Sequence, residues 1–177
     1  DMLVVITGSA VTGSIAPTCT GDQSGAYVGA GAHVYADDVT DTNFRMFVQQ
    51  MGATPDDTLT ITRGGTSTRG GGTAVLVLRG ASSTLDATGT AVGITNGTRA
   101  DPPAVSPSTA VAIIVAGGAS GYNNNTGTAF TVPSGMVEVV SQVANGSTAD
   151  CIFWLAYAYW VSGTYNPPAV TGGSSDA

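Results

Sequence analysis

Apolar residues alternate with small or polar ones in short runs along most of the chain, and this pattern predicts strands rather than helices. The alternation is clearest over residues 44–50, where Phe44, Met46 and Val48 fall on one face of a strand. Two further runs, residues 73–80 and 109–118, are rich in Ala and β-branched residues and are too short for a buried helix or a membrane span. We interpret both runs as central strands around which the other elements are organised.

Gly, Pro and Asn separate the remaining apolar runs, which is typical of antiparallel strands joined by turns. Pro102, Pro103 and Pro107 cannot donate to a strand ladder, so they place residues 101–107 in a loop. Asn145-Gly146 is typical of a tight hairpin turn. Further strands are predicted at residues 2–7, 27–36, 59–62, 130–133, 136–143 and 150–162, and a weak edge strand at 86–96.

The chain shows no amphipathic helix of useful length and no repeat of fixed period. Residues 1–177 are therefore predicted to form a single all-β domain, an antiparallel two-sheet β-sandwich with jelly-roll-like topology.

The last predicted strand, residues 150–162, is apolar on both faces, although a sandwich strand needs only one core-facing side. The second face is expected to be covered by a loop of the same chain or a neighbouring subunit, which we favour, by an entirely internal core, or by a stacked sugar ring. The candidate residues for an interface or for ligand stacking are Trp154, Trp160, Tyr157, Tyr159 and, from the Gly/Asn-rich loop at 117–126, Tyr122.

Charged residues make up only 10% of the 177 positions, against about 25% in a typical chain. The net charge is −7 and there is no Lys. Such an acidic chain repels phosphate backbones and anionic lipids, so we expect neither nucleic-acid nor membrane-surface binding. Cys19 and Cys151 are far apart in sequence and are expected to be free, partly buried thiols, although one disulfide is an alternative.

No residue pattern indicates catalysis or a cofactor. Glu138 is the only Glu and His33 the only His, and no Ser lies in a Gly-x-Ser-x-Gly motif. Five aspartates near predicted turns offer oxygen ligands for calcium, but their spacing does not match a calcium-binding loop, so we interpret them as turn caps. These residues are Asp37, Asp38, Asp41, Asp56 and Asp57. We expect no metal, no cofactor and no enzymatic activity.

Five short segments carry a family resemblance: Asp1-Met-Leu-Val-Val5, Leu78-Arg-Gly80, Leu85-Asp-Ala87, Asp101-Pro-Pro-Ala104 and Ser162-Gly-Thr-Tyr-Asn-Pro-Pro168. Together they resemble a Gly/Thr/Ala-rich β-sandwich module of tailed-bacteriophage and prophage virion proteins. The resemblance implies a non-enzymatic tail, head-appendage or capsid-decoration module on the virion surface, with other virion subunits as partners and assembly as a homo-oligomer. In that family one further strand follows a segment like residues 171–176, so we expect either that the strand is absent or that the sequence is an interior piece of a longer polypeptide.

Two other functions stay open. A lectin-like module that binds host-surface glycan would place aromatic rings beside polar side chains, for example Tyr122 near residues 123–125. A sandwich that lacks a final strand can also accept one from a neighbour, which would make the chain a donor-strand-assembled subunit of an extracellular filament.

Overall fold

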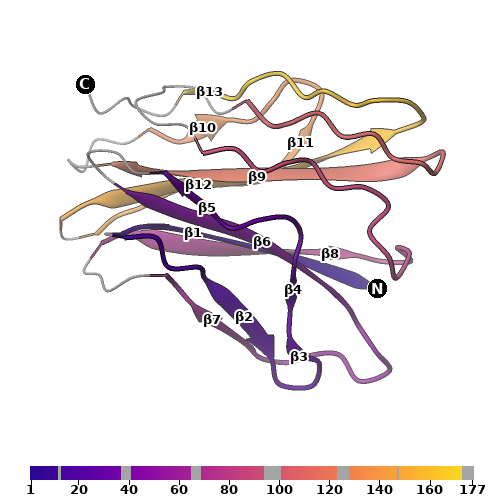
Figure 1. The fold of residues 1–177 in the computed structure, drawn as a ribbon, viewed down its shortest axis with the longest axis horizontal. Coiled ribbons are helices and arrows are strands. Elements are labelled where there is room, and N and C mark those ends of the chain that lie inside the picture. The colour runs from indigo at the N-terminus through magenta and orange to yellow at the C-terminus, as the bar shows by residue number, and fades with distance from the viewer. Residues whose placement is uncertain are drawn as a thin grey trace.

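The computed structural model describes residues 1–11, 13–36, 41–64, 69–93, 101–122, 128–146 and 148–172. Within them the chain forms thirteen strands, arranged in four antiparallel sheets, and no helix. Figure 1 shows the sheets stacked as layers. The predicted all-β antiparallel sandwich is confirmed, whereas the jelly-roll topology stays a prediction.

Two larger sheets pack face to face and form the sandwich. The first sheet has the order β4 (Val28–Gly29), β6 (Thr42–Gln50), β1 (Met2–Ala10), β8 (Gly71–Leu78), with β5 (Val34–Ala36) also paired to β6. The second sheet has the order β11 (Val137–Ala144), β12 (Asp150–Trp160), β9 (Ala112–Tyr122).

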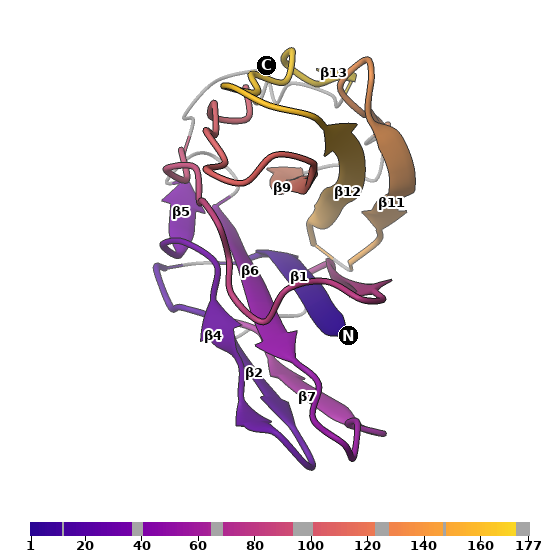
Figure 2. The ribbon, with the colours of Figure 1, turned by 90° about the vertical axis from the view of Figure 1, so that its right-hand side faces the viewer.

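Two smaller sheets cover the outer faces of this sandwich, and Figure 2 shows them at opposite ends of the stack. Below the first sheet lie β2 (Thr18–Gly21), β3 (Gly25–Ala26) and β7 (Leu59–Thr62). Above the second sheet lie β10 (Phe130–Thr131) and β13 (Thr171–Gly172). The sequence predicted strands at the positions of β7 and β10 but not these additional layers, because β2, β3 and β13 are too short to show a periodic pattern.

Strand β1 is buried on both faces, and its uninterrupted apolar sequence follows from this position. Ile6 packs with Phe153 and Leu155 of the second sheet. Val5, which points to the opposite face, packs with Phe47 and with residues of the smaller sheet beneath. A strand with an alternating pattern has a polar face that suits contact with water. Because neither face of β1 meets water, β1 needs apolar side chains in both directions.

The two runs interpreted as central strands lie at sheet edges in the part of the chain that the structure describes. β8 is the last strand of the first sheet and β9 the last strand of the second. The side chains of Val75 and Val77 on β8 are exposed. On its other face β8 lies so close to the second sheet that a Cβ atom on Gly72 would be 2.0 Å from the ring of Phe153. The central positions belong instead to strands with larger side chains buried on both faces, such as β1 and β12.

The edge strand expected at residues 86–96 is absent from the described part of that segment, residues 86–93. Asp86 accepts hydrogen bonds from the Ser108 hydroxyl and from the Thr109 backbone N–H, the latter at 2.8 Å. These bonds tie the segment to the loop that precedes β9. The segment therefore covers the side of the sandwich instead of adding a strand to it; residues 94–96 lie outside the described residues.

Candidate interaction site

One face of β12 is covered by the chain itself. Ile152, Trp154 and Ala156 pack against Phe130 and Val170, which come from the segments that form the outer β10–β13 layer. Trp154 is only 1% exposed. The expectation that a second apolar face needs a cover is confirmed, and a loop segment of the same chain supplies it. The interpretation of Trp154 as an exposed interface or stacking ring is wrong.

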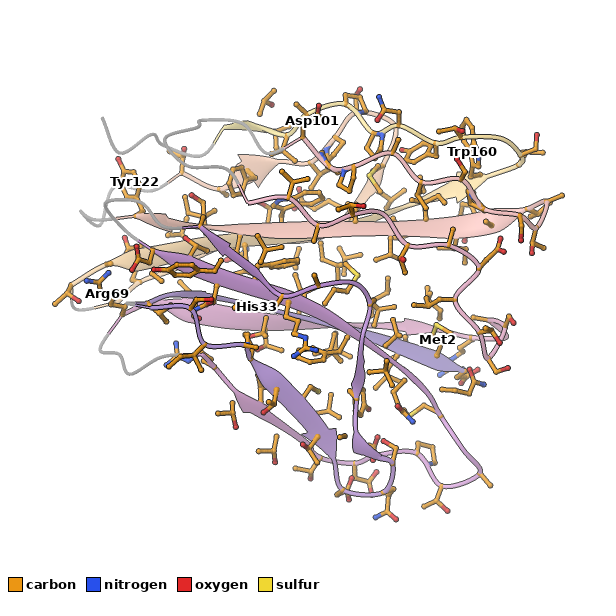
Figure 3. All side chains as sticks on the ribbon, in the orientation of Figure 1. Met2, His33, Arg69, Asp101, Tyr122 and Trp160 are labelled. Atoms are coloured by element: carbon orange, nitrogen blue, oxygen red, sulfur yellow. The ribbon has the colours of Figure 1, made fainter. Side chains whose placement is uncertain are left out.

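Tyr122 is also enclosed, with 8% of its surface exposed, and residues 117–122 belong to β9 and not to the Gly/Asn-rich loop predicted at 117–126. It ends β9 opposite Asp150, at the other end of the sandwich from Trp160 (Figure 3). The glycan groove expected beside Tyr122 would need residues 123–125, which lie outside the described residues.

The other face of β12 changes from core to surface along its length. Phe153 and Leu155 are buried against the first sheet, Tyr157 is half-buried, and Tyr159 is 72% exposed. Ile113 pairs with Tyr159, and Val137 pairs with Tyr157, so their side chains share this face. We call this surface the apolar overhang; it consists of Val111, Ile113, Val137, Tyr157, Tyr159 and Val161.

The two tyrosines of the apolar overhang contact each other edge to face, with ring centroids 5.8 Å apart and planes at 90°. Trp160 projects from the opposite face of the strand. Its indole N–H donates to the Gly163 carbonyl oxygen at 3.1 Å, and its ring centroid lies 4.9 Å from that of Tyr165. The half-buried Trp160 ring is thus held by the chain's own loop, whereas Tyr159 projects toward solvent.

Val111 holds an unusual backbone conformation within the apolar overhang. Its φ angle is +62°, in the left-handed region, where a β-branched side chain is strongly disfavoured. Its N–H donates to the Val161 carbonyl oxygen at 2.9 Å, and its side chain is 74% exposed. The cost of such a conformation is roughly 1–2 kcal/mol, and strained residues of this kind cluster at functional sites.

A cavity of about 720 Å³ lies behind the apolar overhang, between the two large sheets. Its apolar walls come from β1, β6 and β9, and segments 79–91 and 102–111 supply the rest of its lining. Val111, Ile113 and Tyr159 line it as well, so the overhang and the cavity form one continuous apolar surface. The wall residues from the three strands include Met2, Val4, Phe44, Met46, Val48, Ile114 and Val115.

Asp56 and Asp41 accept backbone hydrogen bonds, as expected of turn caps. The Asp56 carboxylate accepts hydrogen bonds from the backbone N–H groups of Gln23 and Ser24 at 2.7 and 2.8 Å. It also accepts from the Ser24 hydroxyl, and from the Tyr27 hydroxyl at 2.8 Å. The hydrogen bond from the Ser24 hydroxyl is the largest cause that holds the pKa of Asp56 well below its usual range. Asp41 accepts from the Gly13 N–H, at 3.3 Å.

Asp37 and Asp38 lie outside the described residues. Among the described residues, no group of His, Cys, Asp and Glu side chains is placed to hold a metal ion. Glu138 is exposed. His33 is half-buried, and its Nε2 is hydrogen-bonded to the Asn43 side chain.

Both cysteines are free and buried, which confirms the expectation of free thiols. Burial raises the pKa of Cys19 to about 11, with a further contribution from the nearby Asp56 carboxylate. Burial likewise raises the pKa of Cys151 to about 12. Neither thiol is suited to act as a nucleophile, because the reactive thiolate form is suppressed at neutral pH.

In the part of the chain that the structure describes, no helix has the length and hydrophobicity needed to cross a membrane. No protein-family model, curated protein or solved structure matches the chain. The apolar overhang and the cavity are therefore the features from which a function has to be inferred. The sequence pointed to the overhang through Tyr157 and Tyr159, but neither the cavity nor the strained Val111 had a local signal.

Proposed function

We propose that this protein is a non-enzymatic structural module of a bacteriophage virion, a tail or head appendage or a capsid decoration, which acts by subunit assembly and display on the particle surface. The apolar overhang is the observation that supports the proposal most strongly. Val111, Tyr159 and Val161 are each more than 70% exposed there. Contiguous exposed apolar surface of this kind usually marks an interface.

The chemistry of the apolar overhang fits association between identical copies. None of its six residues is charged, and it includes two Tyr, a residue enriched in interfaces. Two chains of net charge −7 repel each other. Contact through an uncharged surface lets copies associate without removing ionised groups from water. We therefore propose a second copy of this chain as the occupant of the overhang, in a homo-oligomer.

The glycan-binding alternative has less support. Two of its candidate rings, Trp154 and Tyr122, are buried. Trp160 already contacts Tyr165 and Tyr157 is half-buried, so Tyr159 is the one largely exposed ring among the five candidates. A glycan array without a hit, together with tryptophan fluorescence that host polysaccharide does not change, would remove this alternative.

The proposal is tested by peptide mapping of phage particles. Particles would be purified by density-gradient centrifugation from a culture that carries the gene, then digested and analysed by mass spectrometry. We expect peptides from this chain at a fixed ratio to those of the major capsid protein, and expect the ratio to persist through a second gradient. Particles that contain no such peptide, while the protein is found free in the culture, would contradict the proposal.

A further inference from the structure

The cavity between the two large sheets is partly open to solvent and measures about 720 Å³. It is thus far larger than the voids of a close-packed core, which rarely exceed a water molecule. Its volume lies within the range of roughly 300–1,000 Å³ that is typical of sites for small ligands. Met2 and Met46 line it, and their unbranched side chains can adapt to the shape of an apolar guest.

Two loop segments supply much of the lining of this cavity. Segments 79–91 and 102–111 both line the cavity, and the Asp86 carboxylate holds them together through the Ser108 hydroxyl and the Thr109 N–H. Gly89 lies close to Pro103, where an added Cβ atom would approach the ring to 2.8 Å. The two loops are thus fixed to each other.

The polar groups of the lining come mainly from the first of these loops. Ser82, Thr84 and Thr88 carry hydroxyl groups, and Arg79 is the basic residue of the lining. Arg79 is exposed, and no described residue is hydrogen-bonded to its side chain or forms an ion pair with it. The carboxylate of Asp86, which also lines the cavity, is occupied by Ser108 and Thr109.

We propose that the cavity binds a single-chain amphiphile with an anionic head group, its hydrocarbon chain between β1, β6 and β9 and its head group at Arg79. The apolar walls can contact the hydrocarbon chain of the ligand. The guanidinium of Arg79, with which no described residue pairs, can bind the anionic head group. A carboxylate, sulfate or phosphate head group satisfies this chemistry, because Arg presents a planar fork of donors to all three.

The first test measures binding of octanoate, decanoate and dodecanoate to the full chain by isothermal titration calorimetry, below their micelle concentrations. We expect one ligand per chain and a dissociation constant that falls roughly fourfold for each added methylene group. Absence of saturable heat with dodecanoate, or an affinity that does not depend on chain length, would overturn the proposal.

The second test concerns the head group and uses dodecyl sulfate, dodecyl phosphate and dodecyltrimethylammonium as additional ligands. We expect the anionic ligands to bind and the cationic one to bind at least tenfold more weakly. Arg79→Gln should weaken dodecanoate binding roughly tenfold, whereas Arg63→Gln, which removes a guanidinium outside the cavity, should not. Equal binding of dodecanoate to the two variants would refute the assignment of Arg79.

The third test fills the cavity and separates this site from the proposed interface. Ala30→Leu and Ala81→Leu each add side-chain volume to the lining at positions outside the apolar overhang. We expect each variant to lose at least fivefold in dodecanoate affinity while its sedimentation behaviour stays that of the wild type. Unchanged affinity in both folded variants would contradict the site, and the chain-length series on the wild type decides the question if neither variant folds.

Discussion

Ile113 and Tyr159 lie directly opposite each other across the β9–β12 ladder, and both side chains are exposed, by 39% and 72%. On the same face of β12, Leu155 is fully buried. One strand thus continues the apolar face of the sandwich beyond the part that the first sheet covers. At the end of this strand, apolar side chains of the kind found in a core are exposed to solvent. This exposed apolar surface is the physical basis of the proposed interface.

Replacing Val111 by Gly should raise the free energy of unfolding by about 1 kcal/mol. The substitution relieves the strain of a positive φ angle, roughly 1–2 kcal/mol, and part of that gain is lost to the greater backbone entropy of Gly. Little burial is lost, because the side chain is 74% exposed. Urea denaturation followed by circular dichroism measures the change, and self-association should weaken in the same variant.

Val161→Gly is the matched control, since Val161 has a similar exposure of 71% and no positive φ angle. We expect its free energy of unfolding to fall by roughly 0.5–1 kcal/mol, the ordinary cost of introducing Gly. If Val111→Gly and Val161→Gly destabilise the protein equally, Val111 is not strained.

The two tryptophans should differ sharply in their effect on stability. Trp154→Ala removes a fully buried ring and should cost about 3–5 kcal/mol of unfolding free energy. Trp160→Ala removes a half-buried ring at the end of the same strand and should cost much less. Acrylamide quenching of the variants Trp154→Phe and Trp160→Phe gives an independent reading. Trp160, which remains in Trp154→Phe, should be quenched more strongly than Trp154, which remains in Trp160→Phe. Stronger quenching of Trp154 would contradict the assigned environments.

Much of the sandwich follows from local patterns in the sequence. The alternation of Phe44, Met46 and Val48 predicted β6, and the doubly apolar sequence of β12 predicted a strand covered on both faces. The outer β10–β13 layer did not follow, although a strand was predicted at residues 130–133, because β13 is two residues long and a period of two cannot be detected in so few positions. Their contact depends on residues 130–131 and 171–172, which are far apart in the chain.

Asp56 should stabilise the protein at neutral pH, with an effect that disappears in acid. The pKa of its carboxyl group is lowered by hydrogen bonds, first from the Ser24 hydroxyl and then from backbone N–H groups and Tyr27. A lowered folded-state pKa contributes stability above the unfolded pKa of about 4, and this contribution is lost as the pH falls toward the folded-state value. Asp56→Asn should therefore be less stable than the wild type at pH 7, with a difference that shrinks below about pH 4.

Asp57→Asn serves as the control for this measurement, since the neighbouring Asp57 carboxylate accepts none of these hydrogen bonds. Chemical denaturation at a series of pH values gives both curves. A stability difference between Asp56→Asn and the wild type that does not vary with pH would show that the carboxylate charge is not what stabilises this turn.

Neither cysteine should react with a thiol reagent in the folded protein. Cys19 is 2% exposed and Cys151 is 0% exposed, and burial raises the pKa of both thiols. With Ellman's reagent at pH 8 we expect no rapid reaction in the native state and two equivalents after unfolding in urea. Ile15→Cys places a thiol at a position that is 54% exposed and provides the positive control. Rapid labelling of the wild type would contradict the burial of the thiols.

The candidate site was predictable only in part, and the reason is geometric. The sequence pointed to Tyr157 and Tyr159 because their strand is apolar on both faces, although a sandwich strand needs only one core-facing side. It could not separate them from Trp154, because which face receives the outer cover depends on where residues 128–136 and 165–172 fold back. The conformation of Val111 and the cavity depend on how the loops at 79–91 and 102–111 fold over the sheets. The local spacing of apolar residues in the sequence does not predict how these loops fold.

Sedimentation equilibrium of the wild type and of Tyr159→Arg tests the proposed assembly most directly. We expect the wild type to sediment at two or more times the mass of one chain at micromolar concentration, in a whole-number ratio. Tyr159→Arg should raise the dissociation constant at least roughly thirtyfold, the effect of losing an interface residue worth about 2 kcal/mol. Val28→Arg, at a site 64% exposed on β4, should leave the association unchanged. A monomeric wild type, or equal association of Tyr159→Arg and Val28→Arg, would contradict the role of the apolar overhang.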